Sequence, residues 1–260
     1  MSQVVEPQRV VRVLPDVPAI DKEFDYLVPA GVDVAVGDVV RVQLHGRRVG
    51  AWIVAVDAEP VPGVALKPLA KVSGRGPAPE LIDLATWAAV RWVGRRASFL
   101  RTAAPPGGVR GQPPAGRPRS IPSDPEVSSG SDRPIDRALA LPRAVLRLGP
   151  GADRYPLLLQ AGREAATAGT QALVLCPSIG EAQVLGRRLR RDGVRTAIVA
   201  HDQPGAAATG EWTSAAFGQA SVVVGARAAA WAPARHLGRV GVLDEHDEVY
   251  QQEQAPTWHA

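Results

Sequence analysis

Three consecutive residues with ionisable side chains, Asp244, Glu245 and His246, follow the apolar run GVL near the end of the sequence. An acid at the end of a buried strand can hold Mg²⁺, and an adjacent Glu can activate a water molecule. The same pattern is also typical of an ordinary polar strand end. A nucleotide-dependent role for these residues would require a phosphate-binding loop elsewhere in the chain.

The Gly-rich turn RLGPGADRY (147–155) lies between a predicted strand and a predicted helix, where phosphate-binding loops occur. A P-loop needs Lys for the β- and γ-phosphates and a Ser or Thr hydroxyl for Mg²⁺. Here Gly149 and Gly151 are followed by Ala152 and Asp153, so both groups are missing and a carboxylate would repel triphosphate. We therefore predict a tight turn that binds no cofactor, and interpret the acids near residue 245 as non-catalytic remnants.

A basic stretch without any acid extends between Asp83 and Asp124, and it contains seven arginines. Arginines neutralise phosphates and aromatic rings can stack on bases, so the stretch could be a nucleic-acid surface. It could equally be a solvated helix face followed by a basic linker. From the aromatic spacing we expect Trp87 and Trp92 to be core residues. The arginines of the helical part that we take as candidate DNA contacts are Arg91, Arg95 and Arg96.

The composition of the 260-residue chain limits the classes of protein to which it can belong. It is 45% apolar and 22% charged, with 30 basic and 26 acidic residues, which is enough apolar content for a folded core. No apolar run approaches the roughly 18 residues of a membrane span, and no signal peptide is apparent, so we expect a cytoplasmic protein without membrane contact. One cysteine, Cys176, excludes a disulfide framework and a Cys-based zinc site, and the histidines show no ligand spacing, so we expect no metal.

Two sequence patterns predict an α/β protein with two folded parts. The first has four strands rich in β-branched residues, which suggest a small β-barrel, and then one helix over 78–101. Pro, Gly and Ser dominate 104–136, which is typical of a linker. After it, apolar strands alternate with helices, as in a parallel sheet. The first strands are expected at 9–14, 24–28, 39–44 and 49–56. The later strands are expected at 144–148, 170–176, 195–200, 220–226 and 239–245, with helices at 154–169 and 180–193.

The last segment, VVVGARAAAWAPARHLGRVGVLDEHDEVYQQEQAPTWHA (222–260), resembles a motif run of the bacterial replication restart helicase family PriA. That family has a Gly-Thr-Arg strand end, Ala-Pro, Leu-Gly, an Asp-Glu-Glu-His strand end and a Pro-Arg-Tyr-His-Ala tail. Residues at matching spacings are Gly225, Arg227, Ala232, Pro233, Leu237, Gly238, Glu245, His246, Asp247, Tyr250, Gln252, Pro256, His259 and Ala260.

Residues 10–56 are similar to the N-terminal domain of the same family, which captures the 3′ end of a nascent strand at a fork. The resemblance implies a pocket formed by Phe24, Asp25, Gly46 and Lys67. The aromatic ring can stack, the glycine turn can approach a ribose, Lys67 can contact phosphate and Asp25 can accept a hydrogen bond from a free 3′-hydroxyl.

The resemblance implies three parts: a 3′-end DNA-binding domain at 1–103, a linker at 104–136, and a degenerate RecA-like helicase lobe at 137–260 that is truncated at residue 260. The family uses ATP with Mg²⁺, and zinc bound by a C-terminal region, and we expect none of these in this chain. We expect a replication restart protein that binds stalled or branched forks without helicase activity. Its expected partners are forked DNA and, in addition, other primosome proteins and single-strand binding protein.

Two alternatives stay open from the sequence. The chain could be part of an active ATP-dependent 3′–5′ DNA helicase of the same family, which requires nucleotide binding to residues 138–260. It could instead be an unrelated nucleotide- or S-adenosylmethionine-binding α/β enzyme that uses GPGADR as its Gly-rich loop. That enzyme would need an acid at the end of the next strand, and the sequence ALVLCPSIG has none.

Overall fold

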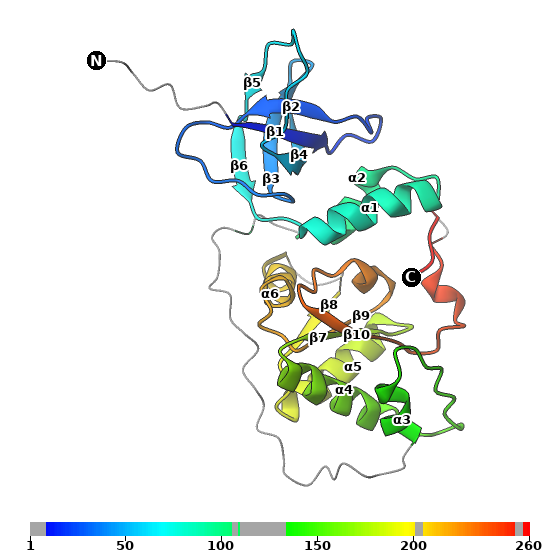
Figure 1. Cartoon of the computed structure of the whole chain (residues 1–260). Coiled ribbons are helices and arrows are strands. Elements are labelled where there is room, and N and C mark those ends of the chain that lie inside the picture. The colour runs from blue at the N-terminus through cyan, green and yellow to red at the C-terminus, as the bar shows by residue number, and fades with distance from the viewer. Residues whose placement is uncertain (1–8, 106–108, 110–133, 201–204, 253–256) are drawn as a thin grey trace. The chain divides into compact units, whose positions relative to one another are not determined.

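The computed structural model describes residues 9–105, 109, 134–200, 205–252 and 257–260, and most of the predicted linker lies outside them. The chain divides into two compact units (Figure 1). The first comprises residues 1–113, 204–213 and 251–259, and the second comprises 114–203, 214–250 and 260. Each unit contains its own sheet, and they are described separately.

The first unit is built on a curled six-stranded sheet with the strand order β5-β2-β1-β4-β3-β6. Neighbouring strands are antiparallel except for β2 and β5, which are parallel. The four strands predicted from β-branched runs are confirmed, whereas the two short ones were not predicted because neither shows a recognisable alternation. The strands are β1 (Val10–Pro15), β2 (Phe24–Leu27), β3 (Val39–Leu44), β4 (Arg47–Val56), β5 (Lys67–Pro68) and β6 (Lys71–Gly74).

The core of this sheet comes from the alternation of its strands. Val11 and Val13 on β1, Val40 and Val42 on β3, and Ile53 on β4 are completely buried. Burying β-branched side chains on one face of a sheet contributes about 1.5–3 kcal/mol for each large residue. This apolar interior is what fixes the register of the strands, because a shift of one residue would expose every one of these side chains.

Two helices follow the sheet where one was predicted. α1 (Pro79–Arg91) and α2 (Arg96–Ala103) are separated by a turn at residues 92–95. Val93 has a φ of 50°, and the Gly94 N–H donates to the Ala89 carbonyl, which closes the first helix. A β-branched residue in this region is rare, so sequence patterning alone favoured an uninterrupted helix.

The turn also changes the burial of the aromatic residues in this segment. Trp87 is 54% exposed, so the expectation that it belongs to the core is wrong, and Trp92 is half-buried. Phe99 on α2 is buried instead. The buried residues of α1 are Leu81, Ile82, Ala85 and Ala88, whereas Trp87, its one aromatic residue, is exposed.

The second unit contains a parallel sheet with the order β10-β7-β9-β8, which confirms the predicted α/β pattern. Val222 and Val224 on its central strands are completely buried. Its elements in chain order are α3 (Pro134–Ala140), α4 (Tyr155–Ala168), β7 (Gln171–Leu175), α5 (Ile179–Arg191), β8 (Thr196–Val199), β9 (Val222–Gly225), a 3₁₀ turn (Arg227–Trp231), β10 (Leu237–Val242) and a second 3₁₀ turn (Glu248–Tyr250). Most of α6 (Gly205–Ala216) belongs to the first unit, and its last three residues belong to the second.

The strand predicted at 144–148 is wrong. These five residues have no regular secondary structure, and Val145 is 94% exposed. Pro142 and Pro150 flank the segment, and both lack the N–H that a central strand would need. A short run of this kind forms a strand only when it pairs with a neighbouring strand. The local strand preference of residues 144–148 was therefore insufficient.

We expect Gly37→Ala to destabilise the first unit much more than Gly31→Ala. Both glycines have positive φ, 91° and 74°, which costs an alanine about 1–2 kcal/mol. A Cβ on Gly37 would lie 1.7 Å from the Pro77 carbonyl oxygen, whereas a Cβ on Gly31 would have nothing within 4 Å. Urea unfolding of both variants measures the difference. Equal loss of unfolding free energy would contradict this close approach of the backbone.

Candidate nucleic-acid interface

Phe24, Asp25 and Lys67 lie on two neighbouring strands of the first unit. Phe24 and Asp25 belong to β2, and Lys67 on β5 is paired with Tyr26, the next residue along β2. Side chains alternate along a strand, so Phe24 and Asp25 point to opposite faces. Phe24 packs against the buried core of the sheet, whereas the side chain of Lys67 is exposed. The structure therefore brings these three predicted site residues to one sheet edge, although not onto one face.

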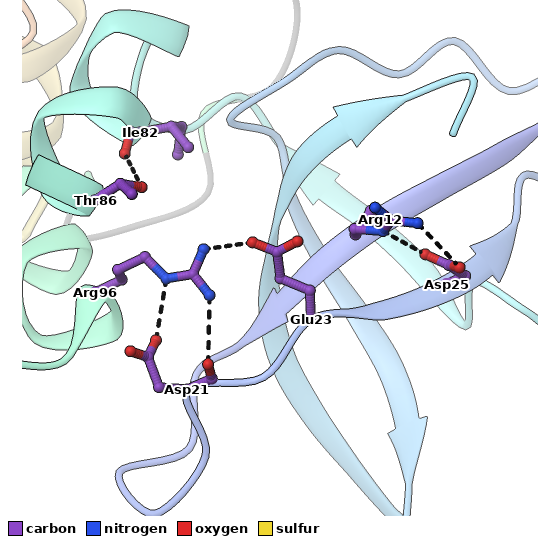
Figure 2. Close-up of polar contacts among 7 residues, drawn as sticks. All are labelled: Arg12, Asp21, Glu23, Asp25, Ile82, Thr86 and Arg96. Carbon is purple, nitrogen blue, oxygen red and sulfur yellow. Dashed lines mark hydrogen bonds and ion pairs between the residues drawn. The ribbon is translucent and has the colours of Figure 1, made fainter. Parts of the chain in front are cut away.

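Asp25 is held in place by Arg12 on β1, as Figure 2 shows. Arg12 Nε donates to Asp25 Oδ1 at 2.8 Å, and Nη2 lies 3.4 Å from Oδ2. The Val61 N–H donates to Oδ2 at 3.3 Å, and the side chain of Asp25 is 5% exposed. The hydrogen bond from Arg12 lowers the pKa of Asp25, so the carboxylate is ionised at neutral pH. Sequence reasoning missed Arg12, although its place opposite Asp25 follows from pairing β1 with β2.

Gly46 lies at the tip of the hairpin that joins β3 to β4. His45 and Gly46 both have positive φ, 46° and 78°, between the paired residues Leu44 and Arg47. A two-residue hairpin turn with both central residues at positive φ favours Gly, as is found in type I′ turns. A Cβ on Gly46 would meet nothing within 4 Å, so its backbone is open to approach.

Two hydrogen bonds connect this hairpin to the strands that carry the other site residues. The Tyr26 hydroxyl donates to the Gln43 carbonyl at 2.9 Å. Arg48 Nη2 donates to the Ala70 carbonyl, three residues after Lys67, at 3.0 Å. These contacts place the base of the hairpin beside Tyr26 of β2 and the residues that follow β5, and the hairpin and β5 both carry exposed basic side chains. Arg48, which the sequence analysis did not select, is therefore part of the surface around Lys67.

The three predicted arginine contacts differ in their environment. Arg96 on α2 bonds to Asp21 Oδ1 at 3.2 Å and forms a short contact with Glu23, as Figure 2 shows. Its guanidinium is thus engaged by two acids of the loop between β1 and β2. Arg91 and Arg95 are exposed, and in the described part of the chain neither forms an ion pair. Arg91 and Arg95 are therefore the better placed of the three to contact phosphate.

The Gly-rich turn of the second unit is closed by its own residues. The Ala152 N–H donates to the Gly149 carbonyl at 3.0 Å, and Gly151 has a φ of 78°. Asp153 Oδ1 accepts a hydrogen bond from the Tyr155 N–H at 2.9 Å, at the start of α4. An acid at a helix start interacts favourably with the free N–H groups there, which are the groups a phosphate would otherwise use.

Arg154, directly after this turn, lies between two carboxylates. Its Nη1 is 2.5 Å from Asp244 Oδ2 and 3.4 Å from Glu181 Oε1. Cys176 is buried nearby, and its pKa is raised to about 12, first by burial and then by Glu181. Glu245 and His246 are exposed after the end of β10. The described residues contain no group of three His, Cys, Asp or Glu side chains that could hold a metal ion.

Comparison with known proteins relates the chain to one family. Residues 12–105 match the PriA 3′ DNA-binding domain family. The chain is 31% identical over 268 residues to the probable replication restart protein PriA of Mycobacterium tuberculosis, covering 94% of this chain and 40% of the relative. The M. leprae protein of the same name is 30% identical over 262 residues, with the same coverage. The replication restart protein PriA of Bacillus subtilis is 31% identical over 111 residues, or 42% of this chain and 14% of the relative.

The chain thus spans about 40% of the length of the mycobacterial relatives it matches. Among the described residues, none of the helices is long and apolar enough to cross a bilayer.

We expect Asp25→Asn to lower the unfolding free energy by about 1.5–3 kcal/mol at pH 7, the range of hydrogen bonds to charged groups. Because the pKa of Asp25 is lowered in the folded state, this stabilisation is present above the usual Asp pKa of about 4 and is lost as pH falls through the folded value. Asp57→Asn is the control, since the side chains of Asp57 and its partner Arg9 are 64% and 43% exposed. Urea unfolding at several pH values measures both, and an Asp25→Asn effect that persists in acid would contradict the role of ionisation.

Proposed function

We propose that this chain, a PriA-like N-terminal part with a 3′ DNA-binding domain, binds branched DNA through the 3′ end of a strand. The match of residues 12–105 to that domain family carries the proposal. The positions of Asp25, Lys67 and the Gly46 hairpin around one part of the sheet support it. We expect this recognition to serve replication restart, as the names of the relatives suggest.

Asp25 is the group that would distinguish a free 3′-hydroxyl. Its carboxylate accepts one short bond from Arg12 at Oδ1, while both contacts at Oδ2 are longer than 3.2 Å. An ionised carboxylate oxygen can accept more than one hydrogen bond, so Oδ2 retains the capacity to accept one from a hydroxyl. A 3′-phosphate in the same place would be repelled by the negative charge.

Lys67 on β5, next to β2, and Arg47 and Arg48 at the hairpin supply exposed positive charge. Contacts to phosphate fix the register and orientation of a nucleic acid without reading its bases. Gly46 adds an open backbone turn that a sugar can approach closely. These features favour recognition of a strand end and its backbone, with affinity that falls as salt rises.

We further propose that the second unit is a helicase-like lobe that does not hydrolyse ATP. Ala152 and Asp153 occupy the positions of the Lys and hydroxyl residue of a P-loop, and Asp153 engages the start of α4. Arg154 neutralises Asp244 and Glu181 within the chain. The residue set therefore lacks the P-loop Lys for the phosphates, and Asp244 already has Arg154 as its partner. Other primosome proteins and single-strand binding protein stay predicted partners.

We expect a fork with a free 3′-hydroxyl on its nascent strand to bind more tightly than the same fork with a 3′-phosphate. Asp25→Asn should reduce this preference about tenfold, since a hydrogen bond to a charged group contributes about 1.5–3 kcal/mol. Lys67→Ala should weaken binding to both forks. Fluorescence anisotropy at two salt concentrations measures each affinity.

Asp57→Asn and Lys71→Ala are the matched controls for that experiment. Asp57 forms an exposed ion pair in the same unit, and Lys71 is an exposed lysine on β6, the next strand along the chain after β5. Asp57→Asn should retain the preference for the hydroxyl, and Lys71→Ala should retain the affinity for both forks. Equal binding of both forks by the unmodified chain would overturn the proposed 3′-end recognition.

We expect MgATP to leave the thermal unfolding of the chain unchanged, because a ligand that binds the native state raises its stability by mass action. Differential scanning fluorimetry with increasing MgATP, together with phosphate release in the presence of forked DNA, tests this. A saturable rise in the unfolding temperature or DNA-stimulated phosphate release would instead support an active helicase.

A further inference from the structure

The C-terminal half of α1 presents a large aromatic ring to solvent. Trp87 is 54% exposed, whereas the other described tryptophans are half-buried, as is Trp92, or buried. The buried ones are Trp52, Trp212, Trp231 and Trp258, each at most 7% exposed. Exposing a large aromatic side chain to water is energetically unfavourable, and exposed aromatic rings are common at binding surfaces.

The Trp87 ring is held in position by two further aromatic residues. Its centroid is 5.2 Å from that of Trp92, with an interplanar angle of 85°. Trp92 in turn lies 6.3 Å from Phe99, which is buried on α2. A T-shaped contact covers at most one face of an aromatic ring, and Trp87 keeps 54% of its surface exposed beside this contact.

Two arginines follow this ring along the chain, and Asp83, four residues before it, lies on the same side of α1. Arg91 follows Trp87 by four residues, so both side chains lie on one side of α1, and its guanidinium is 5.9 Å from the Trp92 ring centroid. Arg95 lies in the turn just before α2. The other two arginines of this segment are neutralised, since Arg96 is paired with Asp21 and Glu23, and Arg101 Nε lies 2.5 Å from Asp16 Oδ1.

We propose that Trp87, Arg91 and Arg95 form a contact for single-stranded DNA that is separate from the 3′-end site. Trp87 would stack on a base, while the two arginines would contact the phosphates on either side. Such platforms combine an aromatic face with a positive backbone track and require no particular base. The contact needs no strand end, so it goes beyond the proposed recognition of the 3′-hydroxyl.

The charge pattern favours a nucleic acid over a protein as the occupant. The acids of α1 are confined to its first half, at Glu80 and Asp83, and both exposed arginines follow Trp87. Val90 and Val93, which are 80% and 95% exposed, add an apolar border that a protein partner could also use. The guanidinium groups of Arg91 and Arg95 can contact phosphates, and the exposed indole of Trp87 can stack on a base. This combination suits a single-stranded nucleic acid better than an apolar protein surface.

A circular oligothymidine is the probe, because it has no 3′ end. We expect it to bind and to quench tryptophan fluorescence, since Trp87 is the most exposed tryptophan described. Trp87→Leu, which keeps an apolar side chain, should abolish most of the quenching and weaken binding about tenfold, as base–aromatic stacking contributes about 1–3 kcal/mol. Arg91→Gln and Arg95→Gln should each weaken binding several-fold and reduce its salt dependence.

Arg101→Gln is the matched control, because it removes the same charge from a guanidinium that Asp16 already neutralises. It should bind the circle with nearly unchanged affinity. Failure of the circle to bind, or unchanged affinity in Trp87→Leu, would overturn this proposal. The proposal would also be overturned if Trp87→Leu changed the self-association of the chain in sedimentation velocity without changing its affinity for the circular oligothymidine.

The two DNA proposals fail independently. A chain that prefers a 3′-hydroxyl fork but ignores the circle contradicts the α1 contact alone. A chain that binds the circle through Trp87 but shows no preference between the two forks contradicts the 3′-end site alone. Circular dichroism of each variant verifies that the fold is retained.

Discussion

The first unit depends on the way one short segment closes its curled sheet. Residues 67–68 pair in parallel with β2, and residues 71–74 pair antiparallel with β3, so only Leu69 and Ala70 connect the two ends of the strand order. The Tyr26 hydroxyl supports this closure by bonding to the Gln43 carbonyl. Because the closure sets β2, Lys67 and the base of the Gly46 hairpin beside one another, every contact proposed for the 3′ end depends on it.

Ion pairing then decides which basic side chains remain available. The loop between β1 and β2 carries Asp16, Asp21 and Glu23, which engage arginines from α2. These pairs attach the helices to the sheet, and Figure 2 shows that Arg96 reaches two of the three acids. A net charge of +4 therefore says little about DNA binding, whereas the distribution of unpaired arginines is informative.

The sequence allowed prediction of elements whose signal is local. The structure confirms the strands β1, β3 and β4, which alternate β-branched residues, and the apolar strands of the parallel sheet. They could be predicted because the spacing of apolar residues along the sequence indicates whether one face or both faces of a strand are buried. The break between α1 and α2 was missed because it rests on Val93 at positive φ, which no propensity favours. The exposure of Trp87 and the partner of Asp25 were missed because both depend on tertiary contacts between separate segments.

Tertiary packing also explains how the second unit keeps its fold with the turn at residues 149–154. Its stability comes from packing of the parallel sheet, where Val222, Val224 and Ala197 are completely buried and Gly186 lies close against Ile198. None of these contacts requires a ligand. The turn before α4 needs its N–H groups satisfied, and Asp153 does this with a side chain in place of a phosphate. Asp244, after β10, is paired with Arg154, which directly precedes α4. Side chains of the chain itself thus satisfy the turn at residues 149–154 and one of the acids that follow β10.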